Sequence, residues 1–74
     1  METFRFSVVV EKNGGRYFVF CPELQGCYSQ GETYEEALEN IRDAIRLHIE
    51  DRLACGEPVP RQEIVSLTTL DVAV

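Results

Sequence analysis

Residues 16–30, RYFVFCPELQGCYSQ, decide the fold because they contain two strand-like stretches joined by a compact loop. The stretch 16–21 is aromatic and β-branched, which favours a β-strand. Pro22 ends that strand, since proline has no backbone N–H to donate to a neighbouring strand. After the loop PELQG, we expect residues 27–30 to form a second short strand that Gly31 ends. The stretch therefore predicts two strands that continue an antiparallel meander.

A helix follows these strands. In GETYEEA, residues 31–37, the Thr33 side chain and the Glu36 carboxylate are spaced to satisfy each other's free backbone N–H groups, an arrangement called a capping box. Apolar residues recur every three or four positions along 38–53, so one stripe of the helix faces the sheet. We expect the helix to run to about Ala54. The acidic residues in its first turns favour the positive end of the helix dipole, so they have a local structural explanation beside a role in binding.

A further strand precedes the two already described. From Thr3 to Glu11, apolar side chains alternate with mostly polar ones, which is the period of a strand with one covered face. The residues from Lys12 to Gly15 include Asn and Gly, which accept positive φ and suit a hairpin turn. Residues 3–30 therefore predict a three-stranded antiparallel meander.

The segment from Gln62 to Val74 predicts a final strand with apolar side chains on both faces. Such a strand is either central in the sheet or paired with a copy of itself. Residues 1–74 then form one α+β domain in the order β-β-β-α-β, with the helix packed on the sheet. We expect a homo-oligomer, most simply a dimer, because so short a chain buries little apolar surface alone. The expected oligomer contacts are Ile64, Val65, Leu67, Leu70 and Val72.

Charge and hydropathy exclude several classes of function. Thirteen acidic residues against seven basic ones give a net charge of -6, and the basic residues are spread along the chain. Because such a surface repels a phosphate backbone, we expect no direct binding to nucleic acid. No apolar run is long enough to span a membrane and no signal peptide is evident, so the protein is expected in the cytoplasm. An acidic surface suits a basic partner, although it also serves solubility.

The sequence contains no pattern typical of catalysis or of a metal site. Its three cysteines form no Cys-x-x-Cys pair, and the single histidine, His48, sits beside the apolar stripe of the helix. We favour reduced, buried thiols and a packed histidine over a nucleophile with its base. Every inward position of the first predicted strand is apolar, so the carboxylate cluster of a metal-dependent nuclease has no place there. We expect no enzyme activity, no cofactor and no metal site.

Two motifs at fixed spacing lie between Gly15 and Pro60, namely Pro-Glu-Leu-x-Gly-Cys and Gly-Glu-Thr-x-x-Glu-Ala. Their residues are Pro22, Glu23, Leu24, Gly26, Cys27, Gly31, Glu32, Thr33, Glu36 and Ala37. Together they resemble the HicB family of antitoxins, whose members carry a Gly-Tyr-x-Ala-x-x-Pro-Glu-Leu-x-Gly-Cys segment and then a Gly-[Asp/Glu]-Thr-x-x-Glu-Ala helix start. This chain departs slightly from that pattern, because Arg16 stands between the glycine and Tyr17.

The resemblance implies a degraded ribonuclease H-like fold that lacks the catalytic carboxylates. It also implies a partner, the toxin HicA, which is a small basic ribonuclease with a double-stranded-RNA-binding-like fold. The antitoxin blocks this toxin by covering its surface, and an acidic chain is complementary to it. The residues that we expect to contact the partner are Glu23, Gln25, Tyr28, Glu35 and Glu39.

The region after Pro60 departs from many members of the family, which carry a C-terminal DNA-binding domain. Fourteen residues follow Pro60, too few for a helix-turn-helix, so we do not expect autoregulation by this chain alone. The alternative to an antitoxin is a stand-alone homo-oligomeric structural or regulatory protein with no cognate toxin.

Overall fold

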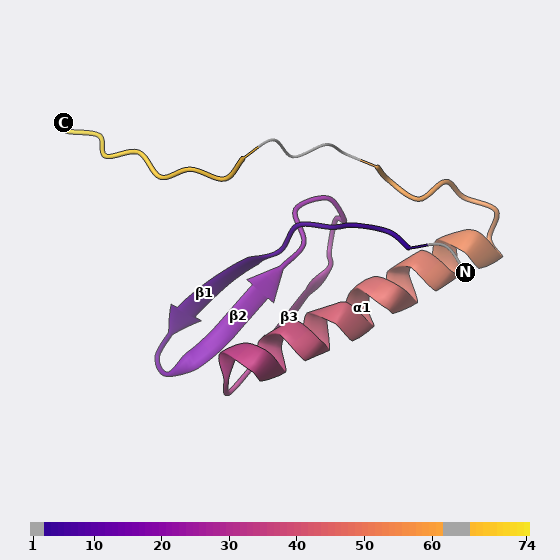
Figure 1. Cartoon of the computed structure of the whole chain (residues 1–74), viewed down its shortest axis with the longest axis horizontal. Coiled ribbons are helices and arrows are strands. Elements are labelled where there is room, and N and C mark those ends of the chain that lie inside the picture. Colours follow the sequence, from indigo (N-terminus) through magenta and orange to yellow (C-terminus); the bar gives the residue numbers. More distant parts are fainter. Residues whose placement is uncertain (1–2, 62–65) are drawn as a thin grey trace.

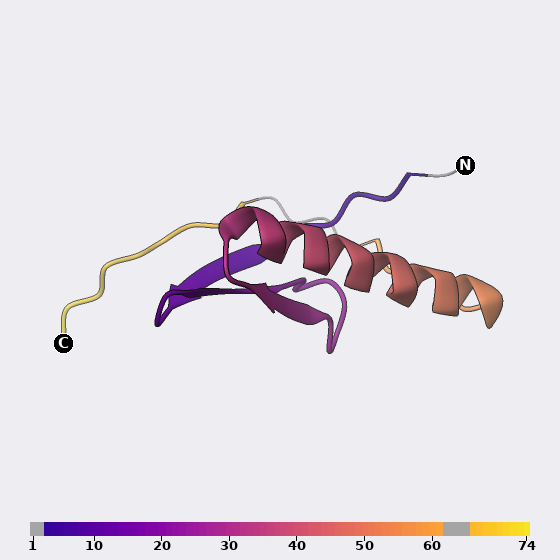
Figure 2. The same ribbon diagram turned by 90° about the horizontal axis from the view of Figure 1, so that it is seen from below.

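The computed structural model describes residues 3–61 and 66–74. A three-stranded antiparallel sheet has the order β1-β2-β3, and a helix packs against one of its faces (Figure 1 and Figure 2). These observations confirm the predicted α+β class, the meander and the packing of the helix on the sheet. The elements are β1 (Val9–Asn13), β2 (Arg16–Phe20), β3 (Tyr28–Gly31) and α1 (Tyr34–Ala54).

A two-residue turn joins β1 to β2. Gly14 and Gly15 both have positive φ, +60° and +81°, a conformation that residues with a Cβ atom rarely adopt. Next to the turn, Asn13 pairs with Arg16. The predicted hairpin is therefore confirmed, and β1 continues two residues beyond its expected end at Glu11.

The predicted start of β1 is wrong. Residues 3–8, which we call the N-terminal segment, lie outside the sheet, and β1 begins at Val9 instead of Thr3. The reason lies in β2, whose five residues pair with the five residues of β1 and are followed closely by Pro22, so that the ladder extends no further. The predicted alternation of side chains is nevertheless present in the N-terminal segment, where the apolar side chains are half-buried and the polar ones are exposed.

The loop between β2 and β3 folds back on itself. The Cys21 N–H donates to the Cys27 carbonyl at 2.9 Å, and the Leu24 N–H donates to the Cys21 carbonyl at 3.2 Å. The Cys27 N–H in turn donates to the Leu24 carbonyl at 3.2 Å. Gly26 has a φ of +77°, the left-handed conformation that glycine adopts without strain. This fold brings Leu24 into the core, where only 1% of it is exposed.

Helix α1 begins at the predicted cap. The Thr33 hydroxyl accepts a hydrogen bond from the Glu36 N–H at 3.0 Å, and the Glu36 Oε1 atom accepts one from the Glu32 N–H at 3.2 Å. Gly31 lies so close to the helix that a Cβ atom on it would stand 2.6 Å from the Ala37 nitrogen. The absence of a side chain at this position therefore lets β3 pass directly into α1.

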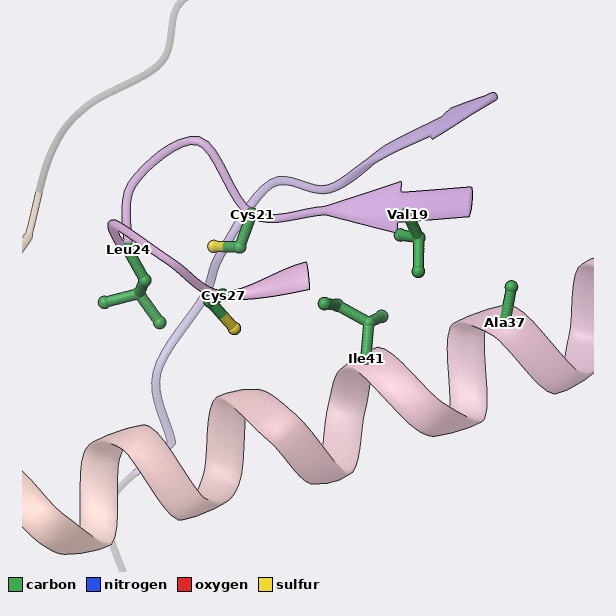
Figure 3. Close-up of a cluster of buried hydrophobic side chains, with 6 residues drawn as sticks. All are labelled: Val19, Cys21, Leu24, Cys27, Ala37 and Ile41. Atoms are coloured by element: carbon green, nitrogen blue, oxygen red, sulfur yellow. The ribbon is translucent and has the colours of Figure 1, made fainter. Parts of the chain in front are cut away.

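The hydrophobic core lies between the sheet and α1 (Figure 3). Cys21 and Cys27 are buried in it, and this burial raises the pKa of both thiols. Cys55 is exposed because it follows the last turn of α1, so the prediction of buried cysteines is confirmed for two of them and wrong for the third. The fully buried core residues are Val19, Cys21, Leu24, Cys27, Ala37 and Ile41.

The predicted C-terminal strand is not part of the described sheet. Residues 62–65, with the expected contacts Ile64 and Val65, lie outside the described residues. Residues 66–74, which we call the C-terminal segment, carry no strand pairing and extend away from the sheet (Figure 1). No strand lies between the described ones, because β1 pairs directly with β2 and β2 with β3, so the predicted C-terminal strand stays a prediction. The large apolar side chains of this segment are highly exposed, with Leu67, Leu70 and Val72 at 78%, 79% and 78%.

Candidate functional site

Glu23 is buried, so the expectation that its side chain is exposed to a partner is wrong. Only 8% of the residue is exposed, and its Oε1 atom accepts a hydrogen bond from the Ser7 N–H at 2.6 Å. The folded loop turns Leu24 into the core and sets the Glu23 carboxylate against the N-terminal segment. Because a charged acceptor makes a stronger hydrogen bond than a neutral one, we assign Glu23 to holding that segment in place.

Tyr28 lies on the face of the sheet that points away from α1. Side chains alternate along a strand, and Val19 of β2 points toward the helix (Figure 3), so Phe18 and Phe20 point to the outer face. Phe20 pairs in register with Tyr28 on one side and with Val9 on the other. We call these residues the outer aromatic patch: Val9, Phe18, Phe20 and Tyr28.

The outer aromatic patch is open to solvent. Phe18, Phe20 and Tyr28 are 40%, 39% and 74% exposed. The sequence analysis does not identify this patch, because it interprets residues 16–21 only as an aromatic and β-branched strand and assigns no face to its side chains. The signal that could have found it is the alternation in that run, where one valine faces the core and its two phenylalanine neighbours face away.

Glu35 and Glu39 lie one helical turn apart on the solvent side of α1, whose inward residues Ala37 and Ile41 are buried. Both glutamates are exposed, and neither has an ion pair or hydrogen bond within the residues that the structure describes. Glu36, by contrast, is engaged in the helix cap. We call Glu35 and Glu39 the acidic pair.

The predicted contact residues do not form one surface. The acidic pair lies on the helix, whereas Tyr28 lies on the opposite face of the sheet. Gln25 is exposed in the loop between β2 and β3, and Glu23 is buried beside it. Four of the five predicted contact residues are exposed, but the structure distributes them over separate surfaces, and their contact with a partner stays a prediction.

A groove lies between the N-terminal segment and α1. Its volume is about 400 Å³, and its lining is mainly apolar, with two exposed arginines. Sequence reasoning missed this groove, because the residues of its first wall were expected in the sheet. The lining residues are Thr3, Phe4, Arg5, Phe6, Val8, Leu38, Ile41, Arg42 and Ile45.

A second hollow lies beside the single histidine of the chain. His48 is half-buried in this hollow of about 270 Å³, which Asp51 and Arg52 also line. No Ser, Thr or Cys is among the described residues that line that hollow, so it shows no hydroxyl or thiol nucleophile beside the histidine. Across residues 3–61 and 66–74, no group of three or more His, Cys, Asp and Glu side chains could hold a metal ion. The helix in this part of the chain is too polar to cross a membrane.

Comparisons with known proteins show which family the sequence and the fold of this chain match. The family described as HicB_like antitoxin of bacterial toxin-antitoxin system matches residues 6–71. A UPF0150 protein of Synechocystis sp. PCC 6803 is 45% identical over 65 residues, covering 86% of this chain and 82% of the relative. A UPF0150 protein of Thermoplasma acidophilum is 40% identical over 65 residues, covering 86% of this chain and 94% of the relative.

A solved structure is similar as well. The crystal structure of the N-terminal domain of the Burkholderia pseudomallei antitoxin HicB superposes with a TM-score of 0.71 at 38% sequence identity, covering 77% of this chain and 68% of that chain. The match of the family over most of the sequence and the match of the fold agree with each other. The chain therefore belongs to the family of HicB-like antitoxins of bacterial toxin-antitoxin systems.

Proposed function

We propose that this chain is an antitoxin that binds a small basic ribonuclease toxin of the HicA type and neutralises it by covering its surface. Membership of the HicB-like antitoxin family is the observation that carries this function. The toxin supplies the chemistry, and this chain acts in the cytoplasm as one non-catalytic domain over residues 1–74.

The proposed fold is a ribonuclease H-like arrangement that has lost its catalytic carboxylates. Phe6, Val8 and Val10 pack against the core, so the side chains directed inward from this region are apolar. A metal-dependent ribonuclease needs inward carboxylates to hold its ions. The apolar lining supports a binding role for the chain.

The acidic pair is the surface that we assign to the basic toxin. Glu35 and Glu39 are exposed and have no cation beside them within the described residues, so a toxin would not have to displace an existing ion pair. Complementary charge speeds the encounter of two proteins. Gln25 and Tyr28 remain proposed contacts on the loop and on the outer aromatic patch, where tyrosine is typical of residues that dominate binding energy.

Association kinetics with a purified HicA-type toxin from the same host test the role of the acidic pair. The double variant Glu35→Gln and Glu39→Gln should associate roughly tenfold more slowly at low salt, and the difference should shrink at high salt. The double variant Glu11→Gln and Glu50→Gln is the matched control, because it removes the same charge from other exposed positions. If both double variants slow association equally, net charge alone is responsible and the acidic pair is not the contact.

A stand-alone homo-oligomer without a cognate toxin is the second candidate. The exposed apolar side chains of the C-terminal segment favour it, because contiguous apolar surface marks an interaction site. Capture on a tagged form of the chain in its native host distinguishes the two. Recovery of a small basic protein in an amount equal to the tagged chain supports the antitoxin. Recovery of untagged copies of the chain without any other protein supports the stand-alone homo-oligomer.

A further inference from the structure

We propose that the C-terminal segment of a second copy of this chain occupies the groove between the N-terminal segment and α1, and that two copies exchange these segments reciprocally. The expected oligomer contacts Leu67, Leu70 and Val72 belong to this segment. The exchange places the contact in a groove that the sequence did not reveal. It does not depend on toxin binding.

The groove suits apolar side chains in size and lining. Its volume of about 400 Å³ leaves room for more than one side chain, given that a cavity of about 150 Å³ holds benzene. Phe6, Val8 and Ile45 line it and pack against the core, yet each remains only half-buried. An occupant completes their burial, and each further Å² of apolar surface removed from water contributes about 25 cal/mol.

The C-terminal segment has the pattern of such an occupant. Leu70 and Val72 are two residues apart, so an extended chain directs both side chains to the same side. Both are more than three quarters exposed, at 79% and 78%, so the described residues of their own chain leave them uncovered. Among the described residues, the groove is open and the apolar side chains of the segment are uncovered.

Opposite charges on the segment and on the groove favour one placement of the C-terminal segment. Asp71, between Leu70 and Val72, is the one charged residue in 66–74. Arg5 and Arg42 line the groove, and both are exposed. None of Asp71, Arg5 and Arg42 has an ion pair within the described residues. Because side chains alternate along an extended chain, Asp71 points away from the side on which Leu70 and Val72 enter the groove, toward solvent, where the exposed Arg5 and Arg42 side chains can reach its carboxylate.

A second copy fits this role better than the same chain. In both Figure 1 and Figure 2 the C-terminal segment leads away from the sheet and from α1. Reciprocal exchange fills both grooves with the same surface and closes into a two-fold dimer. β1 is the outer strand of the described sheet and directly follows Val8 of the groove, so an extended segment arriving there also meets a strand edge that residues 3–61 and 66–74 leave unpaired.

Charge reversal tests the exchange. We expect the full chain to form a dimer in light scattering at micromolar concentration. Arg42→Asp or Asp71→Arg alone should weaken dimerisation roughly tenfold or more, because like charges then face each other. The chain with both substitutions should dimerise again. Arg46→Asp is the control, because Arg46 is exposed on the next turn of α1 and does not line the groove. Circular dichroism checks that every variant keeps its helix.

Mixing the two single variants gives the sharpest result. In a mixed dimer, residue 71 of each segment meets a residue of opposite charge at position 42 of the groove that receives it, so native mass spectrometry should show the heterodimer in excess over either homodimer. Truncation after Leu67 should give a monomer. A monomeric full chain, or a dimer that Arg42→Asp leaves unchanged, would overturn the exchange; the second result would point to C-terminal segments that pair with each other.

Discussion

The Ser7 backbone N–H donates to the Glu23 Oε1 atom at 2.6 Å, although the two residues are 16 positions apart in the sequence. This bond joins the N-terminal segment to the loop between β2 and β3. Within the part of the chain that the structure describes, the N-terminal segment has no strand partner at this point, and a side chain supplies the acceptor that a neighbouring strand otherwise provides. The glutamate of the Pro-Glu-Leu motif therefore helps to place one wall of the groove.

Removing the Glu23 carboxylate should destabilise the fold. We predict that Glu23→Ala lowers the free energy of unfolding by roughly 1–3 kcal/mol, because the partly buried Ser7 N–H loses its acceptor. Glu23→Gln should cost less, since the amide oxygen still accepts a hydrogen bond. Urea titration followed by circular dichroism measures both. Gln25→Ala is the control, because Gln25 is exposed in the same loop; an equal loss in Glu23→Ala and Gln25→Ala would mean that the bond to Ser7 contributes nothing.

Gly31 should tolerate no side chain. We predict that Gly31→Ala lowers the free energy of unfolding by roughly 1–3 kcal/mol, as overpacking does. The added Cβ would lie 2.6 Å from the Ala37 nitrogen, a backbone atom that moves only if the start of α1 moves. Denaturant unfolding decides this, with Gln30→Ala as the exposed neighbouring control. A loss no larger than that of the control would show that β3 and α1 separate easily.

The helix cap gives a third prediction. Thr33→Ala should lower the free energy of unfolding by about 1 kcal/mol, because the Glu36 N–H loses the hydroxyl that accepts its hydrogen bond. Thr33→Ser keeps that hydroxyl and should retain most of the stability. Thermal and denaturant unfolding of the three proteins should agree on this order. Equal stability of the alanine and serine variants would exclude the hydroxyl as the cap.

The buried thiols make stability depend on pH at the alkaline end. Desolvation by burial raises the pKa of Cys21 and Cys27 in the folded chain. In the unfolded chain, the pKa of a cysteine thiol is about 8.5. Above that pH the unfolded state loses protons that the folded state still holds, so the free energy of unfolding should fall as pH rises. Unfolding measured from pH 7 to 10 tests the sign. The double variant Cys21→Ala and Cys27→Ala should be less stable at pH 7 and should lack this part of the slope.

Thiol labelling checks the same burial independently. With excess reagent at neutral pH, the exposed Cys55 should react at once, and Cys21 and Cys27 should react only as the chain unfolds. Rapid labelling of all three thiols in the folded protein would show that the core is open to solvent.

Local signals explain which parts of the fold could be predicted. The adjacent glycines at 14 and 15 specify the hairpin, and the spacing of Thr33 and Glu36 specifies where α1 begins. Each of these signals lies within a few residues of the structure that it determines, so the sequence alone reveals it. The exposure of the acidic pair could also be predicted, because a helix places residues four apart on one side.

The remaining features depend on contacts between distant residues. The start of β1 is set by where β2 stops, and the burial of Glu23 is set by a bond to Ser7 from another part of the chain. The groove exists only because the N-terminal segment leaves the sheet while still packing beside α1. No pattern within 3–8 distinguishes a half-buried extended segment from a paired strand, since both alternate with the same period.

The most direct measurement of the proposed antitoxin function is RNA cleavage by a purified HicA-type toxin from the same host, followed as the chain is added. We predict that cleavage falls in proportion to added protein and ceases near one chain per toxin molecule, while a complex of the two appears in size-exclusion chromatography. Undiminished cleavage at a large excess of the chain, with no complex formed, would show that this member of the HicB-like family does not neutralise that toxin.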